Sequence, residues 1–151
     1  MDARTVDHVL LATARLVTGV SVQAADQLGD LSPVQLRALT VIRDLGRPKL
    51  VQLTEEMGVT VSTTSRLVDR LVAADLVDRR ASETTRREIT LSLTAHGTEL
   101  LGSYDRLRVH GLRARLAELP PPDQETVVQA LALVTEAGTA GGDGGRSTPS
   151  R

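Results

Sequence analysis

The sequence predicts a mainly α-helical fold with one small β-sheet, and three patterns lead to this prediction. Four side chains in the middle of the chain share the spacing of a single helix face: Thr64, Leu67, Val68 and Leu71. Downstream, three apolar side chains alternate with polar ones, as in a strand: Ile89, Leu91 and Leu93. Long helical patterns flank this central part at residues 5–28 and 94–119, and Thr94 is the expected N-cap of the second. Ser32, Pro33 and Gln35 predict a capping-box start for a further helix before the central one. A chain of 151 residues fits a single domain or one compact subunit.

The central helix is predicted to begin after Thr60, whose hydroxyl can accept a hydrogen bond from a backbone N–H two or three residues on. The face opposite the apolar stripe is polar. It carries short hydroxyl groups near the N-terminal end and charged groups beyond them: Ser62, Thr63, Ser65, Arg66, Asp69 and Arg70. Such a helix on its own is more often a solvated amphipathic helix than a binding surface.

The segments on either side of this helix change that interpretation. Residues 50–57 form a short helical pattern that ends at Gly58, a residue suited to a left-handed turn. After the central helix, Leu76 and Val77 are typical of a strand, and a polar loop from Arg79 to Glu88 leads into the alternating run. The order of elements therefore predicts a helix-turn-helix followed by a two-stranded wing.

A helix-turn-helix with a wing predicts duplex DNA as the partner. A helix in the major groove presents its N-terminal residues to base edges, and arginine can donate two hydrogen bonds to guanine. The predicted hairpin tip carries Arg86 and Arg87, which suit backbone phosphates or a narrow minor groove. A charged hairpin tip alone is usually solvated surface, so the prediction depends on the helix and the hairpin together.

Residues 32–97 resemble the winged-helix region of the MarR-type (multiple antibiotic resistance regulator) repressors. The resemblance is carried by LSPVQLRALTVI at 31–42, GVTVSTTSRLVDRLVAADLVDRR at 58–80 and TTRREITLSLTAHG at 84–97. It implies a winged helix-turn-helix flanked by N- and C-terminal dimerisation helices. It also implies a sequence-specific regulator of transcription, in most cases a repressor, that binds double-stranded DNA.

Within this resemblance, we hypothesise a role for each polar side chain of the central helix and the wing. Four would read base edges: Ser62, Thr63, Ser65 and Arg66. Three would contact backbone phosphates: Thr60, Arg70 and Arg87. Arg86 would enter the minor groove.

Two positions depart from the family pattern. The family usually has an aspartate at the wing tip that helps to orient a wing arginine, and Thr84 stands in its place here. Glu83 and Glu88 are the candidates to substitute for that acid. Val61 stands where many relatives carry a polar or basic residue, so we expect one phosphate or base contact to be lost there.

The helical patterns at the two ends of the chain predict a homodimer. We divide the chain into an N-terminal dimerisation helix (1–31), the winged helix-turn-helix (32–94), C-terminal dimerisation helices (95–137) and a disordered tail (138–151). The end helices have apolar stripes that one small winged helix would not cover, although they would also fit into one larger monomer core. Two-fold symmetry would make the DNA operator an inverted repeat.

The resemblance also implies a small effector. In the family, phenolic or aromatic carboxylate ligands bind between the dimer helices and the DNA-binding region. Four polar side chains are candidate linings for such a site: His8, Arg15, Arg37 and Tyr104. Each is also readily explained as an ordinary surface or interface group.

The composition narrows the range of functions. The absence of cysteine excludes thiol-based redox sensing, Cys-ligated zinc and disulfides. His8, His96 and His110 are too scattered to suggest a metal site, so we expect no metal or cofactor. Net charge is −1. Residues 32–94 hold ten basic and eight acidic groups and the remainder eight and eleven, so any DNA affinity depends on where the arginines lie.

Two other classes of protein are alternatives to a DNA-binding regulator: an enzyme and a winged helix that binds protein. The sequence shows no nucleophile–base pair, Gly-rich phosphate loop or paired-carboxylate motif, so we expect no enzyme. A protein-binding face would more often show apolar or aromatic anchors, and residues 62–70 have none on their outward side. No apolar run approaches the roughly 20 residues of a membrane span, so we expect a cytoplasmic protein.

Overall fold

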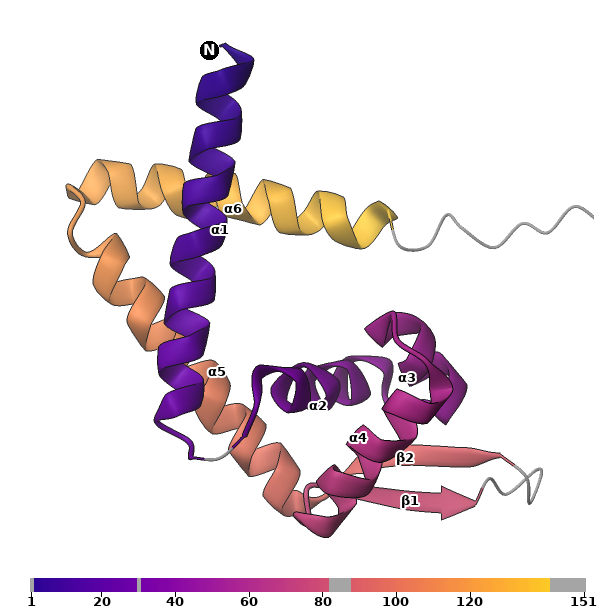
Figure 1. The fold of residues 1–151 in the computed structure, drawn as a ribbon. Helices are drawn as coiled ribbons and strands as arrows, with labels where there is room; N and C mark the ends of the chain where they lie inside the picture. The colour runs from indigo at the N-terminus through magenta and orange to yellow at the C-terminus, as the bar shows by residue number, and fades with distance from the viewer. Residues whose placement is uncertain (1, 30, 82–87, 142–151) are drawn as a thin grey trace, which may run out of the picture. The chain divides into compact units, whose positions relative to one another are not determined.

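A computed structural model describes residues 2–29, 31–81 and 88–141. Its elements follow in the order α1 (Ala3–Asp26), α2 (Pro33–Leu45), α3 (Leu50–Met57), α4 (Val61–Ala73), β1 (Val77–Ala81), β2 (Ile89–Leu93), α5 (Ala95–Leu116) and α6 (Pro121–Gly141) (Figure 1). This is the mainly helical fold with a small wing that the sequence predicts. The chain divides into two compact units, residues 1–111 and 112–151.

The helices of the central region begin at the caps that the sequence predicts. At α2, the Ser32 hydroxyl accepts from the Gln35 N–H and the Gln35 side chain accepts from the Ser32 N–H, which forms a capping box. At α4, the Thr60 hydroxyl accepts from the Thr63 N–H at 3.2 Å. Between α3 and α4, Gly58 has a left-handed φ of 66°. Helices α3 and α4 are therefore the two helices of the helix-turn-helix.

The wing is an antiparallel hairpin of β1 and β2. Its register runs from Val77 opposite Leu93 to Ala81 opposite Ile89. Arg79 lies inside β1, so three residues that the sequence assigns to the wing loop, 79–81, belong to the strand. Only the first residue of β1 is buried. Backbone pairing with β2 needs no apolar side chains, and an exposed polar strand of this kind is easily mistaken for a loop.

The linker between α2 and α3 extends the wing sheet. Lys49 forms an isolated antiparallel bridge with Thr90 of β2. The Leu91 N–H donates to the Pro48 carbonyl at 2.9 Å. The wing is thus attached along its β2 edge to the turn that leads into the helix-turn-helix.

The core of the first unit is aliphatic and is shared by its helices and the wing. Its fully buried side chains come from α2, α3, α4, both wing strands and α5 and include Leu39, Ile42, Leu53, Leu71, Leu91 and Leu101. Thr64 of α4 is also buried, and its hydroxyl donates to the Thr60 carbonyl at 3.1 Å, so no polar atom is left without a partner there. The recognition helix α4 is held by this core.

Helix α5 is joined to the segment after α4 by hydrogen bonds of Thr94 and by a close contact of Gly97 with the backbone. The Thr94 hydroxyl donates to the Asp75 carbonyl at 2.7 Å and accepts from the Gly97 N–H at 2.9 Å, which caps α5 as the sequence predicts. Gly97 packs directly on the backbone of Leu76, and a Cβ at this position would overlap the Leu76 carbonyl oxygen. The junction therefore requires glycine for space.

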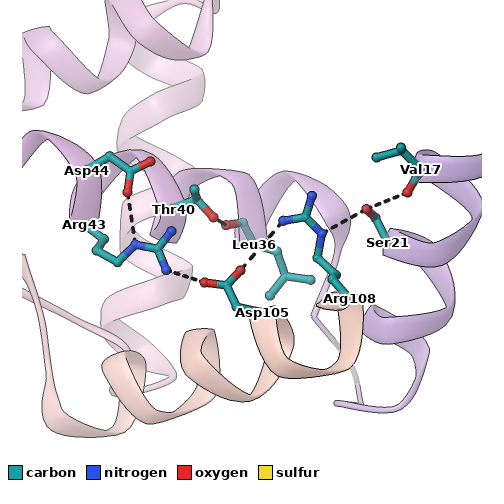
Figure 2. A network of polar contacts seen from close by, with 8 residues as sticks. All are labelled: Val17, Ser21, Leu36, Thr40, Arg43, Asp44, Asp105 and Arg108. Carbon is teal, nitrogen blue, oxygen red and sulfur yellow. Dashed lines mark hydrogen bonds and ion pairs between the residues drawn. The ribbon is translucent and has the colours of Figure 1, made fainter. Parts of the chain in front are cut away.

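A polar network links α1, α2 and α5 (Figure 2). The Asp105 carboxylate of α5 accepts from Arg43 of α2 at 2.5 Å and lies 3.7 Å from the Arg108 guanidinium. Arg108 in turn donates to the Ser21 hydroxyl of α1 at 3.1 Å and lies over the Tyr104 ring. The hydrogen bond that Arg43 donates to the Asp105 carboxylate is the main cause that raises the pKa of Arg43 above its ordinary value.

The second unit consists of the end of α5 and α6. None of residues 121–137 is buried. One stripe of α6 is apolar, and its side chains are between 36 % and 69 % exposed: Val127, Val128, Leu131 and Val134. The helix continues to Gly141, four residues into the segment 138–151 that the sequence assigns to a disordered tail, and residues 142–151 lie outside the described range.

Helix α1 is long and apolar enough, by length and composition alone, to cross a membrane. Its most apolar 18-residue window has a mean hydropathy of 1.2 and is 17 % buried, whereas the sequence led us to expect no such segment. One helix of this kind is weak support for a membrane span, because core helices pass the same test. At its C-terminal end, Val20, Ala24 and Ala25 are buried in the first unit.

Candidate nucleic-acid interface

The outward face of α4 is polar and accessible. Ser62, Thr63, Arg66 and Arg70 are exposed, and Ser65 is half-buried. Within the described part of the chain, neither Arg66 nor Arg70 forms an ion pair. The structure therefore brings five of the predicted contact residues together on one surface, with these two arginines among them.

Thr60 and Thr63 form the N-terminal edge of this surface. Their hydroxyl oxygens lie 3.0 Å apart, and the Thr60 hydroxyl also caps the helix. A hydroxyl engaged in this way is held in place and keeps one lone pair for a further donor or one proton for an acceptor. The two threonines thus present a fixed pair of short polar groups beside the first turn of α4.

Arg79 of β1 is a residue of this surface that sequence reasoning missed. Its guanidinium pairs with the Asp69 carboxylate of α4 at 2.8 Å and donates to the Ser65 carbonyl at 3.3 Å. These contacts tie the wing to the recognition helix. They also neutralise Asp69, which is the acid on a face otherwise suited to an anion. The apolar Val77 could have indicated this contact. Residues two apart in a strand lie on the same face, so Arg79 lies on the face of β1 that Val77 turns toward the core.

The base of the wing carries a second ion pair. The Lys49 ammonium lies 2.8 Å from the Glu88 carboxylate, which holds the α2–α3 linker against the start of β2. Glu88 was a candidate to replace the missing wing-tip acid, and in the structure it pairs with Lys49. The wing-tip residues Glu83, Thr84, Arg86 and Arg87 lie outside the described residues.

A surface hollow adjoins the polar face of α4 on the side of α2. Its volume is ≈ 330 Å³. It is lined by residues of α2, of α4 and of the turn between α3 and α4: Ser32, Val34, Gln35, Met57, Val59, Thr63, Arg66, Leu67 and Arg70. Two guanidinium groups and the N-terminal turn of α2 meet there, and both favour a negatively charged group.

Comparisons with known proteins agree with this geometry. The model of the MarR family matches residues 31–89, which run from the start of α2 to the start of β2. An uncharacterised HTH-type transcriptional regulator of Bacillus subtilis, YfiV, is 29 % identical over 109 residues, which cover 72 % of this chain and 68 % of that protein. Residues 31–89 thus carry the similarity to the MarR family. Members of this family are DNA-binding transcription regulators rather than enzymes.

Solved structures extend the similarity to the helices outside the MarR winged helix. The crystal structure of RV1404 from Mycobacterium tuberculosis is 28 % identical, covers 97 % of each chain and superposes with a TM-score of 0.82. The transcriptional regulator Tm0710 from Thermotoga maritima shares the fold at 21 % identity, with a TM-score of 0.76 over 89 % of this chain and 94 % of that one. The fold similarity thus includes the long end helices.

The four candidate effector residues have different surroundings. His8 and Arg15 are exposed on α1. Arg37 of α2 donates to the Glu56 carbonyl at 3.2 Å and so binds the C-terminal end of α3. Tyr104 is buried in the core, with the Arg108 guanidinium 5.2 Å from its ring centre. His8, Arg15 and Arg37 therefore keep the explanation as surface groups, whereas Tyr104 is a core residue.

Proposed function

We propose that this protein is a homodimeric repressor that binds an inverted-repeat operator through α4 and the wing and is released by a small organic acid. The observation that carries the proposal is the outward face of α4. It combines short hydroxyl groups with two arginines that have no ion-pair partner among the described residues, while its acid, Asp69, is neutralised by Arg79. Such a face suits both base edges and phosphates.

The proposed contacts follow the positions of the side chains along α4. Ser62, Thr63, Ser65 and Arg66 stand in its first two turns, the part of a recognition helix that reaches base edges. Thr60 and Arg70 would hold phosphates, and the hollow beside α2 offers a phosphate seat between Arg70 and the α2 N-terminus. Wing residues Arg86 and Arg87 would complete the interface in the minor groove and on the backbone.

A homodimer is supported by the exposed apolar stripes of the end helices. Large apolar side chains of α1 and of the α6 stripe are exposed, among them Leu10 at 63 % and Val134 at 69 %. Contiguous exposed apolar surface of this kind marks association sites. A protein of the same fold, a single-residue mutant of MepR from S. aureus, has been solved bound to an oligodeoxyribonucleotide, at 16 % identity and a TM-score of 0.69.

Release by an organic acid is supported by one protein of the same fold. BpsR of Bordetella bronchiseptica has this fold at 21 % identity and a TM-score of 0.60, and its DNA binding is regulated by 6-hydroxynicotinic acid. We keep His8, Arg15, Arg37 and Tyr104 as the proposed effector residues. A ligand there acts only by binding one spacing of the two recognition helices more tightly than the other.

The first test is a footprint on the DNA upstream of the gene, followed by titration of the protected duplex. Arg66→Ala should weaken binding by about 1–3 kcal/mol and relax base choice at one position. Arg106→Ala is the matched control, because Arg106 is an exposed arginine on α5 that bonds to Ser103. If Arg66→Ala keeps the wild-type ratio of operator to scrambled-DNA affinity, Arg66 does not read bases.

The second test addresses the wing. Arg86→Ala should weaken binding evenly across sequences and reduce the slope of log affinity against log salt by about one. Titration at four or more salt concentrations measures that slope. An unchanged affinity and slope would remove Arg86 from the interface.

The alternative is a winged-helix module that binds protein without reading DNA. A footprint with no protected inverted repeat at moderate salt would favour it. We place the protein in the cytoplasm because its proposed partner, duplex DNA, lies there in bacteria such as those of its relatives.

A further inference from the structure

Val61 is an exposed apolar side chain at the start of the recognition helix. It is the first residue of α4, and 56 % of it is accessible. A β-branched residue is a weaker helix former than alanine, so an exposed valine at this position contributes nothing to the helix itself. The fold therefore gives no account of the choice of valine.

The neighbours of Val61 place it on the surface proposed to enter the major groove. Val61, Ser62, Ser65 and Arg66 stand at positions i, i+1, i+4 and i+5, which form one patch over the first two turns of a helix. Ser62 and Ser65 have short side chains, so the two methyl groups of Val61 are not overshadowed by either serine. The patch is apolar at one corner and polar at the other three.

We propose that Val61 is a specificity-determining residue that recognises the C5-methyl group of a thymine in the major groove. The proposal rests on the proposed function and adds a base to it. Among the four bases, only thymine presents a methyl group in that groove, and the other edges there offer hydrogen-bond donors and acceptors that valine cannot pair. Apolar contact with the thymine methyl is the readout open to an aliphatic side chain.

Charge favours DNA over a protein partner as the occupant of this patch. The guanidinium groups of Arg66 and Arg70 form no ion pair with any described residue, and the carboxylate of Asp69 is bound by Arg79. The patch is thus cationic around a single apolar corner.

The experiment uses the full-length protein and deoxyuridine, which differs from thymidine only by lacking the methyl group. A preferred duplex is first selected from a random library at moderate salt. Each thymine of one half-site is then replaced in turn by deoxyuridine, and affinities are measured by fluorescence anisotropy. At one position the wild-type protein should lose about fourfold in affinity, which is about 0.8 kcal/mol, and about sixteenfold when both half-sites are changed.

Two variants identify the side chain that reads the methyl group. Val61→Ala should bind the thymidine and deoxyuridine duplexes equally at that position. Val72→Ala should keep the fourfold ratio, since Val72 lies about three turns further along the same side of α4 and is 38 % exposed. Circular dichroism and thermal melting establish that both variants fold, as expected for exposed positions.

The outcomes separate the inference from the proposed function. A selected operator that the wild type binds equally with deoxyuridine at every position, or that contains no thymine, overturns the role of Val61 and leaves the proposed function intact. The same holds if Val61→Ala keeps the fourfold ratio. Failure to select any duplex overturns both.

Discussion

Helices α4 and α6 each carry a stripe of side chains at helical spacing, but the stripe of α4 is buried and the stripe of α6 is exposed. The four stripe residues of α4 are at most 8 % exposed, whereas those of α6 are at least 36 % exposed. The stripe of α4 lies in the shared core and packs on α3 and on β1 of the wing. Helical periodicity therefore identifies a face that is suited to packing against apolar surface. The same periodicity does not show which chain supplies that surface.

The largest effect is expected in α4. Leu71→Ala should lower the free energy of unfolding by about 3 kcal/mol, because Leu71 is fully buried and its removal leaves a cavity. Urea denaturation followed by circular dichroism measures this. The loss should be the same at every protein concentration, since the partners of Leu71 belong to its own chain.

The matching change in α6 should act on association instead. Leu131→Asp should raise the dissociation constant of the proposed dimer about 100-fold, or about 2.7 kcal/mol, because a charge would enter an apolar interface. Sedimentation equilibrium gives the constant. The control is Leu133→Asp, on the opposite face of α6 and 69 % exposed. Equal effects of the two variants would show that the stripe is not the interface.

The polar network of α1, α2 and α5 joins these helices through side-chain contacts, and its contribution to the free energy of unfolding can be measured. Asp105→Asn should cost about 1 kcal/mol of stability, because it weakens the bonds to both Arg43 and Arg108, and the loss should shrink as salt is raised. Asp44→Asn is the control, since Asp44 touches Arg43 from a more exposed position. Thermal melts at low and high salt compare the two, and equal losses would mean that the network contributes no more than a surface pair.

The smallest effect is a gain in stability at the end of α4. Asp75 has a φ of 56°, a conformation that glycine adopts at no cost. Asp75→Gly should therefore raise the free energy of unfolding by about 0.7 kcal/mol. A lower melting temperature for the variant would show that the Asp75 side chain stabilises the fold by more than its positive φ costs.

Features set by nearby residues were predictable from the sequence. Ser32, Thr60 and Thr94 cap the helices they were expected to cap, and Gly58 makes the left-handed turn. Each depends on atoms within three or four residues, so a short stretch of sequence contains the whole interaction.

Features that join distant segments were not predictable in the same way. The bond from Arg108 to Ser21 spans 87 positions, and the pair of Arg79 and Asp69 joins a strand to a helix. Many carboxylates and hydroxyls were equally eligible partners in the sequence. Packing of the aliphatic core determines which of them come within reach, and a single sequence does not reveal that packing. The contact roles proposed for the DNA-binding residues remain predictions.

The junction at Gly97 has an evolutionary consequence. There the backbone of α5 rests on the backbone of Leu76, with no side chain between them. Substitutions elsewhere can drift and compensate one another, because most contacts have two variable partners. The contact between Gly97 and the Leu76 backbone involves no variable side chain. A methyl group added at position 97 therefore cannot be accommodated by a substitution elsewhere. We expect relatives with the same α4–α5 joint to have diversified their operators and effectors around this glycine while retaining it.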